Sequence, residues 1–195
     1  MIKIAVLGDI GSGKSFVAKQ FGYPVFDADK EVTKIYRSDR SCYKKIKKNF
    51  PSFINSKIIK KNELGNVIRE NKKNLKKISD IVHPIVRKRM HSFIKKNNKK
   101  KMLVFDIPLL VENKLYDKNF YLIFIQAAKN EIDIRLKKRP LYNKNIINSL
   151  RKAQKSLLYK KKISNFILKN NFKLQTVKKR IKIIKKEIIN ERNSS

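Results

Sequence analysis

The sequence predicts an α/β fold in which a parallel β-sheet lies between two layers of helices. Short apolar segments recur along the chain, helical patterns separate them, and the first segment runs directly into a glycine-rich loop. Strands that alternate with helices in this way are typical of parallel sheets covered on both faces. The length of 195 residues fits one domain with room for a small inserted lobe.

Five short segments are predicted strands, and none shows the strict polar alternation of a half-exposed sheet. Their apolar runs indicate strands that are buried on both faces. In chain order the predicted strands are residues 2–7, 24–27, 102–106, 120–125 and 166–168.

Helical spacing of apolar residues fills the intervals between the predicted strands. One pattern resumes at Phe16, and another begins near Asp29 with acidic residues in its first turn. Residues 32–100 are rich in lysine and contain no convincing strand, so we expect a helical insertion there. Residues 129–138 are also predicted to be helical. In residues 174–188 the apolar side chains recur every three or four positions, which predicts a helix packed on the sheet, with a partner- or membrane-binding helix as the alternative.

The chain is strongly basic, with 50 Lys and Arg against 15 Asp and Glu and a formal net charge of +35. Such a charge favours contact with nucleic acid or another polyanion. Lysine, isoleucine and asparagine are all abundant, however, and a genome rich in A and T would encode the same profile. Arginine, which groove-reading proteins favour, is the minority cation. We therefore expect attraction of small anionic ligands, with neither a nucleic-acid nor a membrane partner.

Composition excludes several other classes of protein. Cys42 is the only cysteine, which rules out an internal disulfide, and His83 and His91 are too few for a histidine-rich metal site. No apolar run approaches the roughly 20 residues of a membrane-spanning helix. A glycine loop interrupts the first apolar segment, so no signal peptide fits. We expect a soluble cytoplasmic protein.

Residues 8–15 carry the pattern G-x-x-x-x-G-K-[ST] between a predicted strand and a predicted helix. Glycines in this setting let the backbone curl so that its N–H groups face phosphate oxygens. Lys14 is expected to reach the β- and γ-phosphates of a nucleoside triphosphate, and the Ser15 hydroxyl to ligate Mg²⁺. A glycine turn that matches by chance is the alternative, and the pattern does not choose among kinase, GTPase and mechanical ATPase. The predicted ATP-binding residues here are Gly11, Ser12, Gly13, Lys14, Ser15 and Phe16.

Asp106 ends the third predicted strand after four mostly apolar residues. An acid at this position can hold a magnesium-bound water in a nucleotide site. We interpret Asp106 as the second Mg²⁺ residue, and a carboxylate that caps the following loop is the structural alternative.

Three further motifs accompany the glycine loop: Asp27-Ala28-Asp29, His83-Pro84 and the D-x-P-L-L-x-E run from Asp106 to Glu112. With these motifs the chain resembles the dephospho-CoA kinase family over nearly its whole length. The resemblance implies a three-layer, nucleotide-kinase-like P-loop nucleoside triphosphate hydrolase fold with an inserted helical substrate lobe and a small lid. It also implies transfer of the ATP γ-phosphoryl group to the ribose 3′-hydroxyl of dephospho-CoA, the last step of coenzyme A synthesis.

The resemblance divides the single domain of residues 1–195 into three parts. The core is expected at residues 1–31, 101–138 and 156–195, the lobe for the CoA-like substrate at residues 32–100, and the lid at residues 139–155. A lid suits a kinase, because water that reaches the site would hydrolyse ATP. Monomer or weak homo-oligomer is the expected state.

The resemblance also implies roles for individual residues. Lys14, Asp29 and Arg139 are the expected catalytic residues, with Asp29 orienting the 3′-hydroxyl and accepting its proton and Arg139 stabilising phosphoryl charge. Capping of the next helix is the alternative for Asp29, and a plain surface charge is the alternative for Arg139. Arg135 is expected to bind ATP.

The expected substrate-binding residues are Asp29, His83, Pro108, Leu109 and Glu112. His83 has a structural alternative, in which Pro84 after it occupies the first position of a helix. Glu112 has an alternative role in maintaining the fold.

Several positions depart from the family pattern. Leu7 and Phe16 stand where threonine is frequent, Asp9 replaces a common glycine inside the loop, and Lys61 stands where an arginine is usual. Ser164-Asn165 replaces a common Ala-Asp pair. Asp9 matters most, because a carboxylate beside a triphosphate repels it unless the side chain faces away.

Three other functions compete with a dephospho-CoA kinase. A nucleoside monophosphate kinase shares the core, lobe and lid, although the D-x-P-L-L-x-E run argues against it. A nucleic-acid-binding ATPase is suggested by charge alone and predicts hydrolysis that nucleic acid stimulates. A non-catalytic relative is disfavoured by the retained Lys14, Ser15, Asp29, Asp106 and Arg139.

Overall fold

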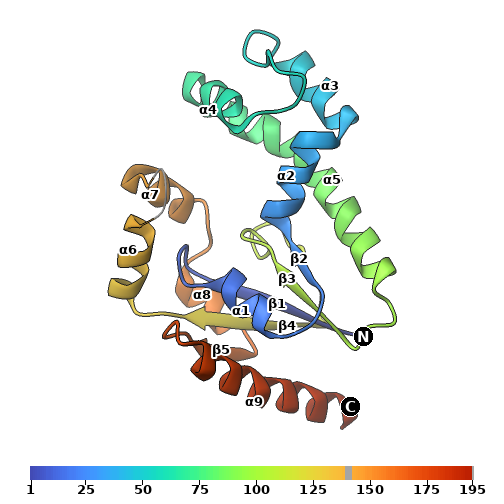
Figure 1. Cartoon of the computed structure of the whole chain (residues 1–195), viewed down its shortest axis with the longest axis vertical. Helices are drawn as coiled ribbons and strands as arrows, with labels where there is room; N and C mark the ends of the chain where they lie inside the picture. Colours follow the sequence, from blue (N-terminus) through green and yellow to red (C-terminus); the bar gives the residue numbers. More distant parts are fainter. Residues whose placement is uncertain (139–141, 195) are drawn as a thin grey trace. The chain divides into compact units, whose positions relative to one another are not determined.

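The computed structural model describes residues 1–138 and 142–194 (Figure 1). The chain forms two compact units. One consists of Met1–Phe26 with Lys99–Ser195, and the other is Asp27–Asn98. The second unit is therefore an insertion in the sequence of the first.

The first unit is built on a five-stranded sheet in the order β2-β3-β1-β4-β5. The central strand β1 pairs in parallel with β3 and β4, and β4 pairs in parallel with β5. All five predicted strands are confirmed, with bounds β1 Ile2–Gly8, β2 Val25–Asp27, β3 Met102–Asp106, β4 Phe120–Gln126 and β5 Phe166–Lys169. Because the central strands are parallel and buried, their carboxyl ends meet at one edge of the sheet.

Helices α1 (Lys14–Gln20) and α9 (Leu174–Asn193) share one hydrophobic core with the sheet. Alternate residues of the strands, such as Ile4 and Val6 of β1, point into this core. Helix α9 contributes its buried residues Val177, Ile181, Ile184 and Ile188. The predicted sheet-packing helix is confirmed, although Leu174, at the start of the predicted apolar face, is exposed. Among the described residues no helix is long and apolar enough to cross a bilayer.

The other strand face carries an aromatic cluster centred on Phe105. Its ring centroid lies 6.2 Å from that of Phe26 and 5.1 Å from that of Phe120, which joins β2, β3 and β4. Helix α8 (Leu157–Lys162) lies beside β1. Helices α6 (Lys129–Lys137) and α7 (Lys144–Lys152) complete this unit.

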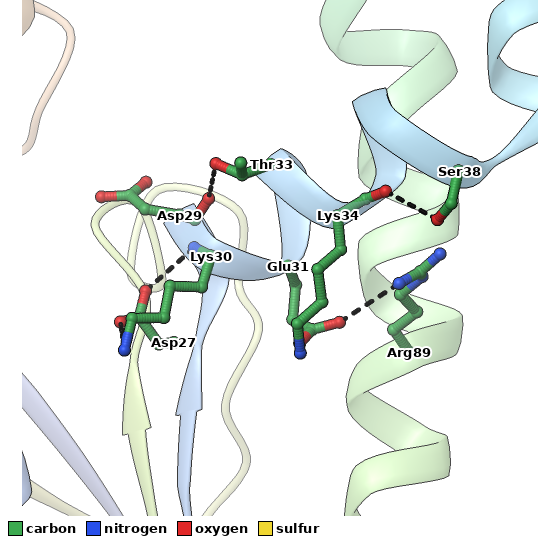
Figure 2. A network of polar contacts seen from close by, with 8 residues as sticks. All are labelled: Asp27, Asp29, Lys30, Glu31, Thr33, Lys34, Ser38 and Arg89. Atoms are coloured by element: carbon green, nitrogen blue, oxygen red, sulfur yellow. Dashed lines mark hydrogen bonds and ion pairs between the residues drawn. The ribbon is translucent and has the colours of Figure 1, made fainter. Parts of the chain in front are cut away.

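The second unit is helical, as predicted for residues 32–100. It consists of α2 (Ala28–Ser38), α3 (Arg40–Asn49), α4 (Lys61–Glu70) and α5 (Asn74–Lys96), and α5 contacts the other three. Arg89 of α5 joins two acids: its Nη1 lies 3.4 Å from Oε2 of Glu31 (Figure 2), and its Nη2 lies 3.8 Å from Oδ2 of Asp39. Cys42 is buried here, and this burial raises the pKa of its thiol to about 11.

The prediction that Pro84 starts a helix is wrong, because Pro84 lies inside the 23-residue helix α5. Proline in a helix interior loses one backbone hydrogen bond and crowds the preceding turn. The buried residues Ile78 and Val82 before it and Val86 and Met90 after it pack on one face of α5. We infer that this packing outweighs the local cost of Pro84, a balance that sequence reasoning did not anticipate.

The core position of α9 gives a stability prediction. Ile181 is 2% exposed, whereas Ile183, two residues later on the same helix, is 49% exposed. Ile181→Ala should lower the free energy of unfolding by about 3 kcal/mol, because it leaves a cavity beneath the sheet. Ile183→Ala, the matched control, should cost less than about 1 kcal/mol. Urea denaturation followed by circular dichroism measures both values, and equal losses would contradict the placement of α9.

Candidate active site

The glycine loop between β1 and α1 has a backbone that only glycine accommodates easily, as Gly8 and Gly13 show. Gly8 has φ 144° and Gly13 has φ 88°. A Cβ atom on Gly8 would lie 2.6 Å from the carbonyl oxygen of Ile125, and one on Gly13 would lie 2.4 Å from Nδ2 of Asn170. Both distances are too short for real atoms, so close packing against β4 and the loop after β5 fixes the turn.

Lys14 folds back over this loop. Its Nζ donates hydrogen bonds to the carbonyl oxygens of Gly8, at 3.1 Å, and Asp9, at 2.8 Å. The carbonyl of Asp9 also accepts a bond of 3.2 Å from the Ser12 N–H, which closes the turn. The ammonium charge is thereby held over the loop, and phosphate oxygens are the ligands that a lysine in this setting serves.

Asn170 braces the loop from the other side. Its buried side chain donates from Nδ2 to the Ser12 carbonyl at 2.8 Å and accepts at Oδ1 from the Phe172 N–H at 2.8 Å. Its own N–H donates to the Gln126 carbonyl at 2.7 Å. A single amide therefore connects the loop to the segment that follows β5.

Arg135, the predicted ATP-binding residue of α6, stacks on Phe172. Its guanidinium carbon lies 3.7 Å from the ring centroid, a cation–π contact. The Phe172 ring would also lie 3.0 Å from a Cβ placed on Gly13. The stack thus lies directly beside the loop and presents a flat, positively charged surface there.

Asp106 ends β3 at the same sheet edge as the loop. Residues Ala5 and Phe105 are paired in the β1–β3 register, so the next residues on both strands, Val6 and Asp106, lead into this edge. The residue is 5% exposed. Ser15, in contrast, is exposed in the first turn of α1, where no described side chain caps the helix.

The hydroxyl of Ser15 and the carboxylate of Asp106 are both oxygen donors, which suit Mg²⁺. Among the described residues, no group of three or more His, Cys, Asp or Glu side chains could hold a metal ion. Mg²⁺ keeps several waters and takes substrate phosphate oxygens rather than an all-protein cage, so one hydroxyl and one carboxylate are enough protein donors for it. The residues present therefore fit the predicted metal.

The two acids of the D-x-D motif have different roles at the start of α2 (Figure 2). Asp27 is the N-cap residue: its Oδ1 accepts from the Lys30 N–H at 3.0 Å, and its Oδ2 lies 3.6 Å from Lys30 Nζ. Asp29 is exposed in the first turn, and its carboxylate points away from the Asp27–Lys30 contact. Its backbone carbonyl accepts from the Thr33 hydroxyl at 2.9 Å. The capping alternative for Asp29 is therefore wrong, because Asp27 is the cap.

Glu112 lies in a buried polar cluster in the first unit. Its Oε1 accepts from the Lys155 N–H at 2.7 Å and lies 2.9 Å from Nζ of Lys160. Lys160 is 2% exposed and also donates to Oε1 of Gln154 at 2.8 Å. These contacts tie the loop after β3 to α8, a structural role that the fold-maintenance alternative anticipated. Contact of Glu112 with substrate stays a prediction.

The other predicted residues fall in three places. Pro108 and Leu109 are half-buried in the loop after β3. His83 lies in α5 of the second unit, where burial and the nearby charge of Arg87 lower the pKa of its imidazole. The lowered pKa favours the neutral imidazole at pH 7. Arg139, the predicted lid-edge cation, lies outside the described residues.

Sequence reasoning missed the ion pair between Asp9 of the loop and Arg151 of α7. It also assigned no role to Phe172. The sequence contained a signal for this pair, because a carboxylate inside an anion-binding loop repels phosphate unless it faces away or is paired with a cation. The chain has many basic residues, and only the position of α7 shows that Arg151 supplies the cation.

Three features of this site together define a class of protein. A strand enters a glycine loop, a lysine is held over that loop, and an acid ends the neighbouring parallel strand. This combination is that of the P-loop kinases and related nucleoside triphosphate-binding enzymes. Comparisons with known proteins give the family. A family model for dephospho-CoA kinase matches residues 2–176, and the chain belongs to the dephospho-CoA kinase family. It is accordingly an enzyme of the ATP-dependent kinase class.

Individual relatives agree with this assignment. The dephospho-CoA kinase of Wolbachia pipientis wMel is 34% identical over 186 residues, which cover 93% of this chain and 95% of the relative. A crystal structure of a Thermus thermophilus protein superposes with a TM-score of 0.79 at 25% identity, covering 95% of this chain and 97% of that one. The dephospho-CoA kinase from Campylobacter jejuni shares the fold, with a TM-score of 0.64 at 22% identity and coverage of 95% and 96%.

The brace formed by Asn170 gives a binding prediction. Asn170→Ala removes both side-chain hydrogen bonds and leaves the buried Ser12 carbonyl without its partner, a loss of about 1–3 kcal/mol. We expect ATP to bind about tenfold more weakly, because the loop is no longer held in its binding geometry. Isothermal titration calorimetry without an acceptor substrate measures this affinity.

The matched control is Asn171→Ala, at the exposed neighbouring position. It should change the ATP affinity by less than about twofold. Equal affinities for the two variants would show that Asn170 does not support the loop.

Proposed function

We propose that the chain transfers the γ-phosphoryl group of ATP to the ribose 3′-hydroxyl of dephospho-CoA, giving coenzyme A and ADP. The observation that carries the proposal is the match to the dephospho-CoA kinase model over residues 2–176. The glycine loop with Lys14 held over its carbonyls supports the ATP part of the reaction.

Phosphoryl transfer depends on alignment and charge neutralisation more than on covalent catalysis. In the proposed reaction the 3′-oxygen forms a bond to the γ-phosphorus, the bond from that phosphorus to the ADP oxygen breaks, and Asp29 accepts the hydroxyl proton. Asp29 is exposed, and Asp27 rather than Asp29 caps α2, which supports this assignment. Lys14 and Arg139 are proposed to stabilise the charge on the transferring group.

Ser15 and Asp106 are proposed to hold Mg²⁺, the former directly and the latter through a bound water. The ion, when bound, neutralises charge on the β- and γ-phosphates. The other contacts to the phosphates are proposed to come from the protein. The loop N–H groups would cradle the phosphates, and the guanidinium of Arg135, stacked on Phe172, would lie beside them.

The substrate contacts remain proposals from the family resemblance. We assign them to Asp29, His83, Pro108, Leu109 and Glu112, within a lobe at residues 32–100 and under a lid at residues 139–155. A neutral His83 would act as a hydrogen-bonding group rather than as a cation toward the CoA phosphates. Cytoplasmic location, a monomer or weak homo-oligomer, and the lack of nucleic-acid and membrane partners also stay predictions.

A coupled assay of ADP release tests the reaction directly. With ATP, Mg²⁺ and dephospho-CoA we expect ADP formation together with coenzyme A, identified by its mass. AMP, CMP and GMP as acceptors should give less than about one hundredth of that rate, since a binding site built for one acceptor discriminates by several kcal/mol. Faster phosphorylation of a nucleoside monophosphate, or ATP hydrolysis stimulated by nucleic acid, would overturn the proposal.

Asp29→Asn tests the proposed proton acceptor. The turnover number should fall about 100- to 1000-fold, because the amide cannot take the proton. The ATP affinity should stay within about threefold of the wild type, as Asp29 is proposed to act on the acceptor hydroxyl. Stopped-time assays and equilibrium ATP binding measure the two effects separately.

The control is Glu70→Gln, which removes an exposed carboxylate from α4 in the same unit. It should leave turnover unchanged within about twofold. Normal turnover of Asp29→Asn would eliminate the role of Asp29.

A further inference from the structure

A carboxylate lies inside the phosphate-binding loop of this chain. Asp9 follows Gly8 directly, and its backbone carbonyl accepts the bond from Lys14 Nζ at 2.8 Å. Only two bonds separate that carbonyl carbon from the side chain's Cβ, so the negative charge is close to the lysine that serves phosphate. An unpaired charge of this kind would repel the ATP phosphates.

The Asp9 side chain pairs with a residue of α7, a helix distant in sequence. Its Oδ1 accepts from Nε of Arg151 at 3.1 Å, and its Oδ2 accepts from Nη2 at 2.8 Å. Oδ1 also accepts from the Ile10 N–H at 2.7 Å, which fixes the orientation of the carboxylate. The two parallel bonds form a bidentate arginine–carboxylate pair, the strongest arrangement for such groups.

The pair is partly shielded from solvent: the side chain of Asp9 is 15% exposed and that of Arg151 is 32% exposed. Hydrogen bonding to Asp9 raises the pKa of the Arg151 guanidinium, and the charge of Asp133 on α6 acts in the same direction. Partial burial weakens screening by salt, so the two charges offset one another effectively. The loop is then left with the positive charge of Lys14.

We propose that Arg151 is a positioning residue of the ATP site, which holds the Asp9 carboxylate out of the phosphate cradle and cancels its charge. The inference rests on the proposed function, because it presupposes ATP in the loop. In this proposal α7 affects the affinity for ATP through Asp9, and Arg151 does not contact ATP. The ion pair also explains how this chain keeps a phosphate loop with an acid where its family commonly has glycine.

Equilibrium binding of Mg²⁺-ATP without an acceptor substrate tests the inference. The variants are Arg151→Ala, Arg151→Lys, Asp9→Asn and the double variant of Asp9→Asn with Arg151→Ala. Lys152→Ala is the matched control, because it removes one positive charge from the exposed neighbouring position of α7. Thermal unfolding of each variant is measured in parallel.

Arg151→Ala should raise the dissociation constant for ATP about tenfold, since Asp9 then carries an unbalanced charge beside the phosphates. Adding Asp9→Asn to that variant should restore the affinity to within about threefold of the wild type, because the charge that needed a partner is gone. Arg151→Lys keeps the charge without the bidentate geometry and should lie between the two. Asp9→Asn alone should bind ATP at least as tightly as the wild type, and Lys152→Ala should match the wild type within about twofold.

Two results would overturn the inference while leaving the proposed function intact. If the double variant binds ATP as weakly as Arg151→Ala, Arg151 contacts the nucleotide itself. If Arg151→Ala and Asp9→Asn lower the unfolding temperature equally without changing ATP affinity, the pair is only structural. Failure of the wild type to bind ATP would instead overturn the proposed function, and the inference with it.

Discussion

The close packing of β4 and of the Asn170 side chain around the glycine loop is the constraint on which the rest of the site depends. A Cβ on Gly8 would meet the Ile125 carbonyl of β4, and one on Gly13 would meet Asn170 after β5. Strands far apart in sequence therefore fix the loop, and the loop keeps its shape only inside the assembled sheet. Lys14 and the Arg135–Phe172 stack take their positions from it.

Charge is the second organising factor. With 15 acidic residues against 50 basic ones, most cations of this chain have no acidic partner available. Several of the acids are paired with particular cations: Asp9 with Arg151, Glu112 with Lys160, and both Glu31 and Asp39 with Arg89. Most of the abundant lysine side chains are thus on the surface, whereas the less exposed ion pairs each join specific residues. Pairs shielded from solvent contribute more than exposed ones, because water and salt screen them less.

The local sequence pattern predicted the strands and helices well, but it did not predict the place of Pro84 within its helix or which aspartate caps α2. The five strands and the sheet-packed face of α9 follow from apolar runs and three-to-four spacing, which report burial directly. Pro84 was misplaced at a helix start because proline's preference is local, whereas the packing of α5 on three neighbouring helices decides its real position. Asp27 and Asp29 are both plausible caps by sequence, and only the backbone path identified Asp27 as the residue that caps α2.

The sequence by itself determined the class of chemistry, because a glycine loop ending in lysine and serine after a buried strand has few uses other than holding phosphate. It also determined the family, through motifs that residues 8–112 carry in order. Only the tertiary structure decided which cation pairs with Asp9, which residues Glu112 contacts, and which side chain supports the glycine loop. Those contacts join residues more than 40 positions apart. With so many similar basic residues, no local pattern could pair Arg151 with Asp9, Lys160 with Glu112, or Asn170 with the Ser12 carbonyl.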